Sequence, residues 1–222
     1  MNTTKLAWSR QIGIYLLAWC VLGGCSRGVR VLRPADLDPD AVGNQAILQY
    51  DTNGDAIIDR AELKSSPGLL EALSATNQDK DKALSAEEIA TRVRFHADRK
   101  VALLPVRYAI TLDGSPLREA TMTLVPEEFF QNGIPAATGI SDDEGIVEPN
   151  MPFDEKYQHQ ATLRGVRPGV YRIQVSKKDA DGRELIPSKY NSESTLGREV
   201  GVGPHQHGPI ISTTRELKLS SR

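Results

Sequence analysis

The sequence predicts a multi-domain α+β protein in which a small helical unit precedes an antiparallel β-sandwich of about seven strands. Two acidic twelve-residue segments recur 26 residues apart within 41–99, and helical periodicity flanks them. From 101 onward, apolar and polar residues alternate between turn signals, which is typical of half-buried strands. The apolar and charged fractions, 39% and 25%, are ordinary for folded domains, and no basic excess indicates a nucleic-acid partner.

The first 24 residues have the pattern of an export signal. Lys5 and Arg10 precede an apolar run over 12–24, which is as long as a signal-peptide core and shorter than the roughly 20 residues that cross a bilayer. The run ends in LGGC at 22–25, which resembles the lipobox of bacterial lipoproteins. This resemblance implies cleavage before Cys25 and diacylation of its sulfur. An uncleaved signal anchor, or a buried helix in which Cys25 is incidental, is the alternative.

Cleavage before Cys25 would leave a mature chain without disulfides, because Cys20 would leave with the signal. An exported chain of this kind depends on its core or on a metal ion for stability. Residues 25–40 then form the lipid anchor and a linker, since 26–40 has three arginines, two prolines and no periodicity. The arginines of this linker are either solvated or in contact with anionic head groups.

The segment 51–62, DTNGDAIIDRAE, has the donors and the spacing of a calcium loop. Calcium prefers oxygen ligands, and a twelve-residue loop supplies them from positions one, three, five, seven, nine and twelve, with a backbone carbonyl at seven. These positions hold Asp51, Asn53, Asp55, Ile57, Asp59 and Glu62. In the copy at 77–88, NQDKDKALSAEE, they hold Asn77, Asp79, Asp81, Ala83, Ser85 and Glu88. The two segments are called loop one and loop two below.

The repeat extends beyond the ligand positions. Ile58 and Leu84 occupy the eighth position, where the backbones of paired loops are expected to bond to each other. Internal repetition marks a duplicated unit. The paired register resembles the EF-hand family over 41–99, and this resemblance implies two Ca²⁺ sites. Because 63–76 is short and contains the helix-breaking SSPG, the pair resembles the compact loops of bacterial calcium proteins and dockerins.

Both loops depart from the usual pattern at the sixth position, where Ala56 and Lys82 replace glycine. A positive φ at this position costs a residue with a Cβ about 1 kcal/mol or more. Asn77 also removes one charge from loop two, so we expect loop one to bind calcium more tightly.

Two acidic helix caps are the alternative interpretation of the loops, because DKALSAEE at 81–88 also has the pattern of a helix start. Between 36 and 90 there are 12 acidic and 4 basic residues, and a divalent ion would relieve their repulsion. The segment 86–100 is then the helix that leaves loop two, and His96 is expected to pack against the core.

In the second half, alternating apolar and polar residues predict strands over 106–112, 120–126, 146–149 and 167–177. Further candidate strands lie at 196–203 and 215–219. The strand and turn motifs VRYAITLDGSPLREATMTLVP, GISDDEG, RPGVYRIQVSK and IPSKYNSESTLGREVGVG resemble the carboxypeptidase-regulatory-like, or transthyretin-like, domain. They are most similar to its version in short lipoproteins of planctomycete-type bacteria. The resemblance implies a Greek-key sandwich over 101–222 without catalytic residues.

The segment 203–214, GPHQHGPIISTT, departs from the short hairpin that this family would place before its last strand. His205 and His207 lie two residues apart there, so both rings would project to one side of an extended chain. Two imidazoles without a third ligand do not make a metal site. We therefore expect both side chains to be solvated.

The sequence contains no HExxH, no GxSxG and no phosphate-binding glycine loop, and it predicts a protein without enzymatic activity. The preferred hypothesis is a lipid-anchored protein of the cell envelope, facing the periplasm or the exterior. Its calcium-bound loops would lie near the membrane, and its sandwich would contact an unidentified envelope protein or polysaccharide. The alternatives are a calcium-regulated adhesion or docking module, or a metal carrier or enzyme that uses His205 and His207.

Overall fold

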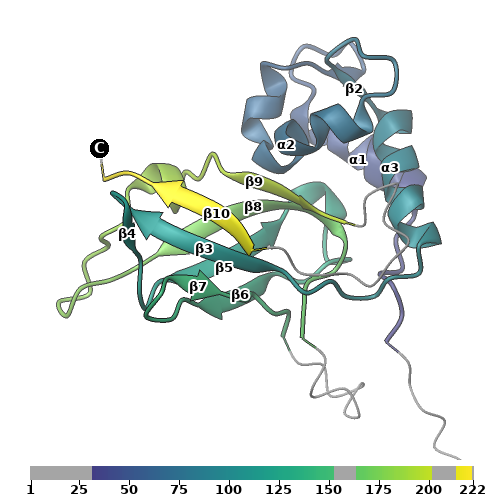
Figure 1. The fold of residues 1–222 in the computed structure, drawn as a ribbon. Helices are drawn as coiled ribbons and strands as arrows, with labels where there is room; N and C mark the ends of the chain where they lie inside the picture. The colour runs from purple at the N-terminus through teal and green to yellow at the C-terminus, as the bar shows by residue number, and fades with distance from the viewer. Residues whose placement is uncertain (1–31, 153–163, 202–213, 222) are drawn as a thin grey trace, which may run out of the picture.

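The computed structural model describes residues 32–152, 164–201 and 214–221. The fold is mixed α+β, and helices α1, α2 and α3 gather at one end of the sheets (Figure 1). The helices are α1 (Pro39–Tyr50), α2 (Pro67–Thr76) and α3 (Ala86–Asp98), with 3₁₀ turns η1 (Glu62–Ser65), η2 (Glu128–Phe130) and η4 (Ser188–Tyr190). None of the helices in the described ranges is long and apolar enough to cross a membrane.

The ten strands of the described ranges form three sheets. They are β1 (Ile57–Ile58), β2 (Leu84–Ser85), β3 (Arg107–Leu112), β4 (Ser115–Pro116), β5 (Thr121–Pro126), β6 (Ala137–Ile140), β7 (Ile146–Val147), β8 (Gly169–Ser176), β9 (Gly197–Val200) and β10 (Thr214–Leu219). The first two strands pair only with each other. One larger sheet has the order β6-β5-β8-β9 and is antiparallel throughout, while in the other β3 pairs with β4, β7 and β10.

One strand pair differs from the expected antiparallel arrangement. β10 runs parallel to β3, with Thr214 opposite Arg107 and Leu219 opposite Leu112. A hairpin forces its two strands to be antiparallel, but these strands lie at opposite ends of the domain sequence and no hairpin joins them. The chain can therefore bring its last strand to the sheet in either direction.

Helix α1 begins earlier than expected. The Asp38 carboxylate accepts hydrogen bonds from the amides of Asp40 and Ala41, and Pro39 occupies the first helical turn, where its missing N–H costs nothing. The helix therefore starts within 25–40, the segment predicted as anchor and linker. Arg33 of that segment also contacts the chain just before β8, since the Arg167 Nη1 donates to the Arg33 carbonyl at 2.9 Å.

The helices and the sheets share one apolar core. Ile58 and Leu84 from the short β1–β2 sheet belong to the same buried cluster as Tyr108 of β3, Met122 of β5 and Tyr171 of β8. Helix α2 lies against β8 and β9 (Figure 1), and its first turn approaches Gly197 so closely that a Cβ there would lie 1.8 Å from the Pro67 carbonyl oxygen. Glycine at 197 thus permits the helical unit to sit on the sheet.

Ion pairs and hydrogen bonds also join the helices α2 and α3 to strand β9. The Glu199 carboxylate of β9 accepts hydrogen bonds from Arg92 at 2.6 Å and from His96 at 2.8 Å, both on α3. Glu71 of α2 pairs with Arg198 at 2.5 Å. Burial alone would raise the pKa of Glu199, but the hydrogen bonds from His96 and Arg92 outweigh it and lower that pKa. The His96 side chain is 11% exposed, so it is partly buried as expected, and it also bonds to a carboxylate.

Candidate functional site

The two candidate loops occupy equivalent places between helices. Loop one follows the last residue of α1 and leads into η1, while loop two follows α2 and leads into α3. Between them, β1 and β2 pair in antiparallel register with Ile58 opposite Leu84. The pairing expected at the eighth loop position is thus confirmed.

The first half of each loop is a series of tight turns closed by side-chain oxygens. The side chains at positions one, three and five each accept a hydrogen bond from an amide two or three residues later. In loop one the pairs are Asp51 Oδ1 with the Gly54 amide at 2.6 Å, Asn53 Oδ1 with Asp55 at 2.9 Å, and Asp55 Oδ1 with Ile57 at 3.1 Å. In loop two they are Asn77 with Lys80, Asp79 with Asp81 at 3.1 Å, and Asp81 with Ala83 at 2.8 Å.

The glutamate at position twelve closes each loop onto its own beginning. Glu62 Oε1 accepts from the Thr52 amide at 2.7 Å, and Glu88 Oε1 accepts from the Gln78 amide, also at 2.7 Å. The Glu62 carboxylate further accepts from the Asp59 amide at 3.0 Å. These hydrogen bonds, that from Asp59 first and those from Thr52 next, lower the pKa of Glu62 and favour its charged form.

The sixth position of both loops has the left-handed backbone that the sequence pattern implied. Ala56 has φ 66° and Lys82 has φ 73°, a region that side chains with a Cβ rarely occupy. The fourth position is also left-handed in both loops, with Gly54 at φ 79° and Lys80 at φ 65°. The two loops therefore follow one backbone path, although their sequences differ at both positions.

The loops differ at their first residue. The second carboxylate oxygen of Asp51, Oδ2, accepts from the Ala56 amide at 2.9 Å. In loop two the matching group is an amide nitrogen, which cannot accept, and Asn77 Nδ2 instead donates to Asp81 Oδ1 at 3.3 Å. The Oδ1 of Asp81, a predicted ligand atom, therefore accepts a hydrogen bond from another side chain of loop two.

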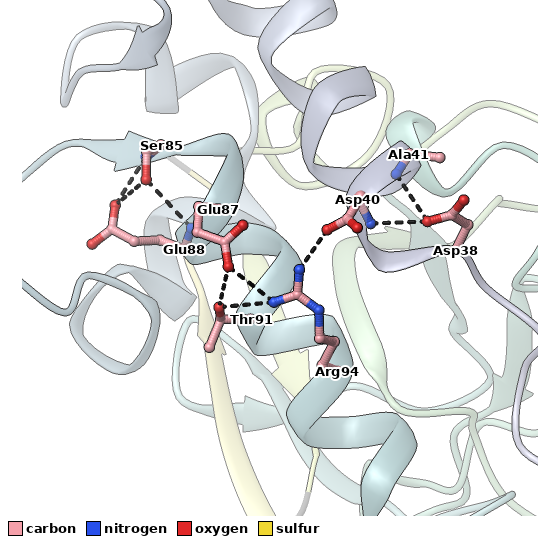
Figure 2. Close-up of polar contacts among 8 residues, drawn as sticks. All are labelled: Asp38, Asp40, Ala41, Ser85, Glu87, Glu88, Thr91 and Arg94. Carbon is pink, nitrogen blue, oxygen red and sulfur yellow. Dashed lines mark hydrogen bonds and ion pairs between the residues drawn. The ribbon is translucent and has the colours of Figure 1, made fainter.

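The same glutamates also cap the structure that follows each loop. Figure 2 shows the capping box at the start of α3, in which the Ser85 hydroxyl accepts from the Glu88 amide and the Glu88 carboxylate accepts from Ser85. At the corresponding place in loop one, Asp59 Oδ1 accepts from the amides of Ala61 and Glu62. The helix-cap interpretation thus describes real contacts, and those contacts use residues at predicted ligand positions.

The donor set of the loops consists of oxygens, which suits calcium. Loop one offers four carboxylates, those of Asp51, Asp55, Asp59 and Glu62, and loop two offers three, those of Asp79, Asp81 and Glu88. Within the described residues, however, no group of three or more His, Cys, Asp or Glu side chains is gathered closely enough to hold a metal ion. The glutamates are directed to backbone amides instead, so binding of an ion requires Glu62 and Glu88 to exchange amide contacts for metal contacts.

Three residues singled out from the sequence lie outside the described residues, namely one predicted site residue and two histidines expected to be solvated. These are the lipidation candidate Cys25 and the two histidines of the 203–214 segment, His205 and His207. Their predicted roles stay predictions.

One buried carboxylate near loop one was missed by the sequence analysis. Glu127, directly after β5, has an exposed fraction of 2% and accepts from the Tyr50 hydroxyl and the Gly68 amide. Burial raises its pKa despite these hydrogen bonds and the nearby Arg172. No local pattern marks this residue, because both of its partners come from distant parts of the sequence.

Comparison with known proteins does not identify a family for this chain. No family model matches it, and no curated protein matches it. Among solved structures it is similar to BcpA, the major pilin subunit of Bacillus cereus, with 14% sequence identity and a TM-score of 0.26. The match covers 53% of this chain and 29% of the pilin chain. A similarity this weak carries no argument about fold or function.

Proposed function

We propose that the protein is a non-enzymatic, calcium-binding, lipid-anchored component of the cell envelope. The observation that carries the calcium part is the repeated loop geometry. At a spacing of 26 residues, both loops have the same turn hydrogen bonds, the same left-handed fourth and sixth residues, and the same closing glutamate. Two unrelated acidic helix caps have no reason to share all of these features or to pair through their eighth residues.

The proposed ligands are the loop positions named from the sequence, with side-chain oxygens at one, three, five, nine and twelve and a carbonyl at seven. Calcium would neutralise carboxylates that otherwise repel one another within each loop. The ion would bind the folded chain and not the unfolded one, so it would also stabilise the fold by mass action. In this proposal, 41–99 is an EF-hand pair with a stabilising role.

The remaining parts of the proposal rest on the sequence motifs. The LGGC motif supports a lipid anchor at Cys25 and thus a place at a membrane of the envelope. The strand and turn motifs of 101–222 support a Greek-key sandwich of the carboxypeptidase-regulatory-like class. Such a sandwich would serve as a structural or interaction module for another envelope protein or a polysaccharide.

Isothermal titration calorimetry of the full chain with calcium tests the metal part of this proposal. We expect heat of binding at or below millimolar calcium in the wild type, and its loss in the double variant Glu62→Gln, Glu88→Gln. The matched control is Glu87→Gln, because Glu87 neighbours Glu88 but bonds to Arg94 and Thr91 instead of to the loop (Figure 2). The proposal fails if the wild type and the double variant give the same heats.

A further inference from the structure

Both ends of loop one are held by a single carboxylate from the sheet half of the molecule. The Tyr50 hydroxyl donates to Glu127 Oε2 at 3.0 Å, and the Gly68 amide donates to Glu127 Oε1 at 2.8 Å. Tyr50 directly precedes Asp51, the first residue of loop one, and Gly68 lies in the first turn of α2, which follows η1. Each oxygen of Glu127 thus holds one side of the loop.

The surroundings of Glu127 fix its position. The Tyr50 ring packs edge-on against Phe129, with ring centroids 6.2 Å apart. Arg172 of β8 lies 3.8 Å from Glu127 Oε2 and donates to the Ser65 carbonyl, at the end of η1, at 2.7 Å. The contact is buried and involves residues at β5 and β8, so it connects loop one to the two inner strands of the β6-β5-β8-β9 sheet.

Loop two lacks this connection. The residue that corresponds to Tyr50 is Thr76, whose hydroxyl donates to the Ala72 carbonyl within its own helix at 3.0 Å. The residue that corresponds to Gly68 is Arg94, which pairs with Asp40 of α1 and with Glu87 (Figure 2). Glu127 therefore contacts residues that flank loop one. The helices that flank loop two contact the sheet half elsewhere, through Glu199 and Arg198 of β9, and not at the residues that correspond to Tyr50 and Gly68.

We infer that Glu127 is a positioning residue for loop one, which acts through Tyr50 and Gly68 to hold the loop ends in the geometry that binds calcium. The inference rests on the proposed calcium function and adds a distant residue that distinguishes the two loops. A network of this kind changes the affinity of a site without touching the ligand. Removing it should loosen loop one more than loop two, which it reaches only through α2 and the β1–β2 pairing.

The test for metal binding uses Tyr50→Phe and Glu127→Ala in two backgrounds. Glu88→Gln leaves only loop one able to bind, and Glu62→Gln leaves only loop two. In the first background we expect calcium affinity to fall roughly 2- to 30-fold, and in the second we expect a smaller fall. The matched control is Tyr190→Phe, because the Tyr190 hydroxyl accepts from the Ser220 amide far from the loops. Equal effects of Tyr50→Phe on both loops, or no effect on either, would overturn the inference.

Amide hydrogen exchange in calcium-free protein gives a readout that does not depend on the metal. The Thr52 and Gln78 amides donate to the closing glutamates of loops one and two over the same distance, so they report on the two loops equally. We expect Tyr50→Phe to speed exchange more at Thr52 than at Gln78. Unchanged exchange at Thr52 would refute the positioning role even if calcium binds. Absence of calcium binding in the wild type would instead refute the proposed function. Tyr50→Phe keeps the ring that packs on Phe129, so this variant remains informative if Glu127→Ala does not fold.

Discussion

At the scale of single residues, the unusual feature of both loops is a side chain with a Cβ at a left-handed position. Ala56 and Lys82 have φ values of 66° and 73°, where glycine is the residue without strain. Such strain persists only where the surroundings enforce it. In loop one, contacts on both sides of Ala56 fix its backbone: its amide donates to Asp51, and the residues that follow it pair with β2.

Glycine at position 56 should relieve this strain. We expect Ala56→Gly to raise the free energy of unfolding by up to about 1 kcal/mol and to tighten calcium binding at loop one. Urea unfolding and calorimetry measure the two effects. Ala41→Gly is the control, because Ala41 lies in the exposed first turn of α1 and glycine there should destabilise. Weaker or unchanged calcium binding in Ala56→Gly would mean that the strain has no bearing on the site.

The first residue of each loop should determine their order of affinity. The Asp51 side chain has two acceptor oxygens, whereas the Asn77 side chain has one. The Asn77 Nδ2 donates a hydrogen bond to Asp81. We therefore expect loop one to bind calcium more tightly than loop two, and Asn77→Asp to strengthen loop two. Titration of Glu88→Gln and Glu62→Gln variants reports each loop separately. Tighter binding by loop two would contradict this order.

At the scale of secondary-structure elements, the short β1–β2 sheet joins the two loops. Ile58 and Leu84 face each other across this sheet, and both have an exposed fraction of 0%. Their side chains also belong to the apolar core shared with the larger sheets. The sheet therefore couples the loops to each other and to the rest of the molecule.

Truncating this contact should be costly. We expect Ile58→Ala to lower the free energy of unfolding by about 2–5 kcal/mol, because it leaves a cavity in a fully buried site. It should also weaken calcium binding at both loops. The control is Leu48→Ala on α1, whose side chain is 79% exposed and whose loss should change stability by less than about 0.5 kcal/mol. Urea unfolding distinguishes the two, and equal stabilities would contradict the assigned role of β1 and β2.

The contact between α3 and β9 predicts a pH dependence. The pKa of Glu199 is lower in the folded protein than in the unfolded chain, so its charged form stabilises the fold. This stability is fully present above the unfolded pKa of about 4.5 and is lost as the pH falls through the folded pKa. We expect Glu199→Gln to destabilise by about 1–3 kcal/mol at pH 7 and by less below pH 4.5.

Thermal unfolding of both proteins across the acidic range measures this difference. Glu216→Gln is the control, because Glu216 pairs with Lys218 on an exposed surface of β10 and solvent screens that pair. A difference between wild type and Glu199→Gln that stays constant from pH 7 to pH 3 would contradict the interpretation.

At the scale of the whole molecule, the local patterns were predictable and the long-range contacts were not. The spacing of oxygen ligands and apolar residues predicted the β1–β2 pairing and the helix after loop two, since both depend on neighbouring residues. Strand β6 was missed because Gly139 interrupts its alternation. A Cβ at that position would lie 2.7 Å from Val147, so the fold requires glycine where the pattern favours a side chain.

Contacts between distant segments could not be predicted from local sequence patterns. The parallel β3–β10 pair, the Glu199 contacts with α3 and the burial of Glu127 each join residues about 60 to more than 100 positions apart. Periodicity and spacing describe one segment at a time, so they give the elements and not how the helical unit sits on the sheets. For the same reason the sequence placed the candidate ligands but did not predict that Glu127 holds the ends of loop one.

The most direct test of the central claim is native mass spectrometry of the full chain titrated with calcium. We predict two bound calcium ions in the wild type, one in Glu62→Gln, one in Glu88→Gln and none in the double variant. The tighter site should fill first and should be the one removed by Glu62→Gln. A wild type that takes up no more calcium than the double variant, at millimolar calcium, would contradict the proposal that these loops are metal sites.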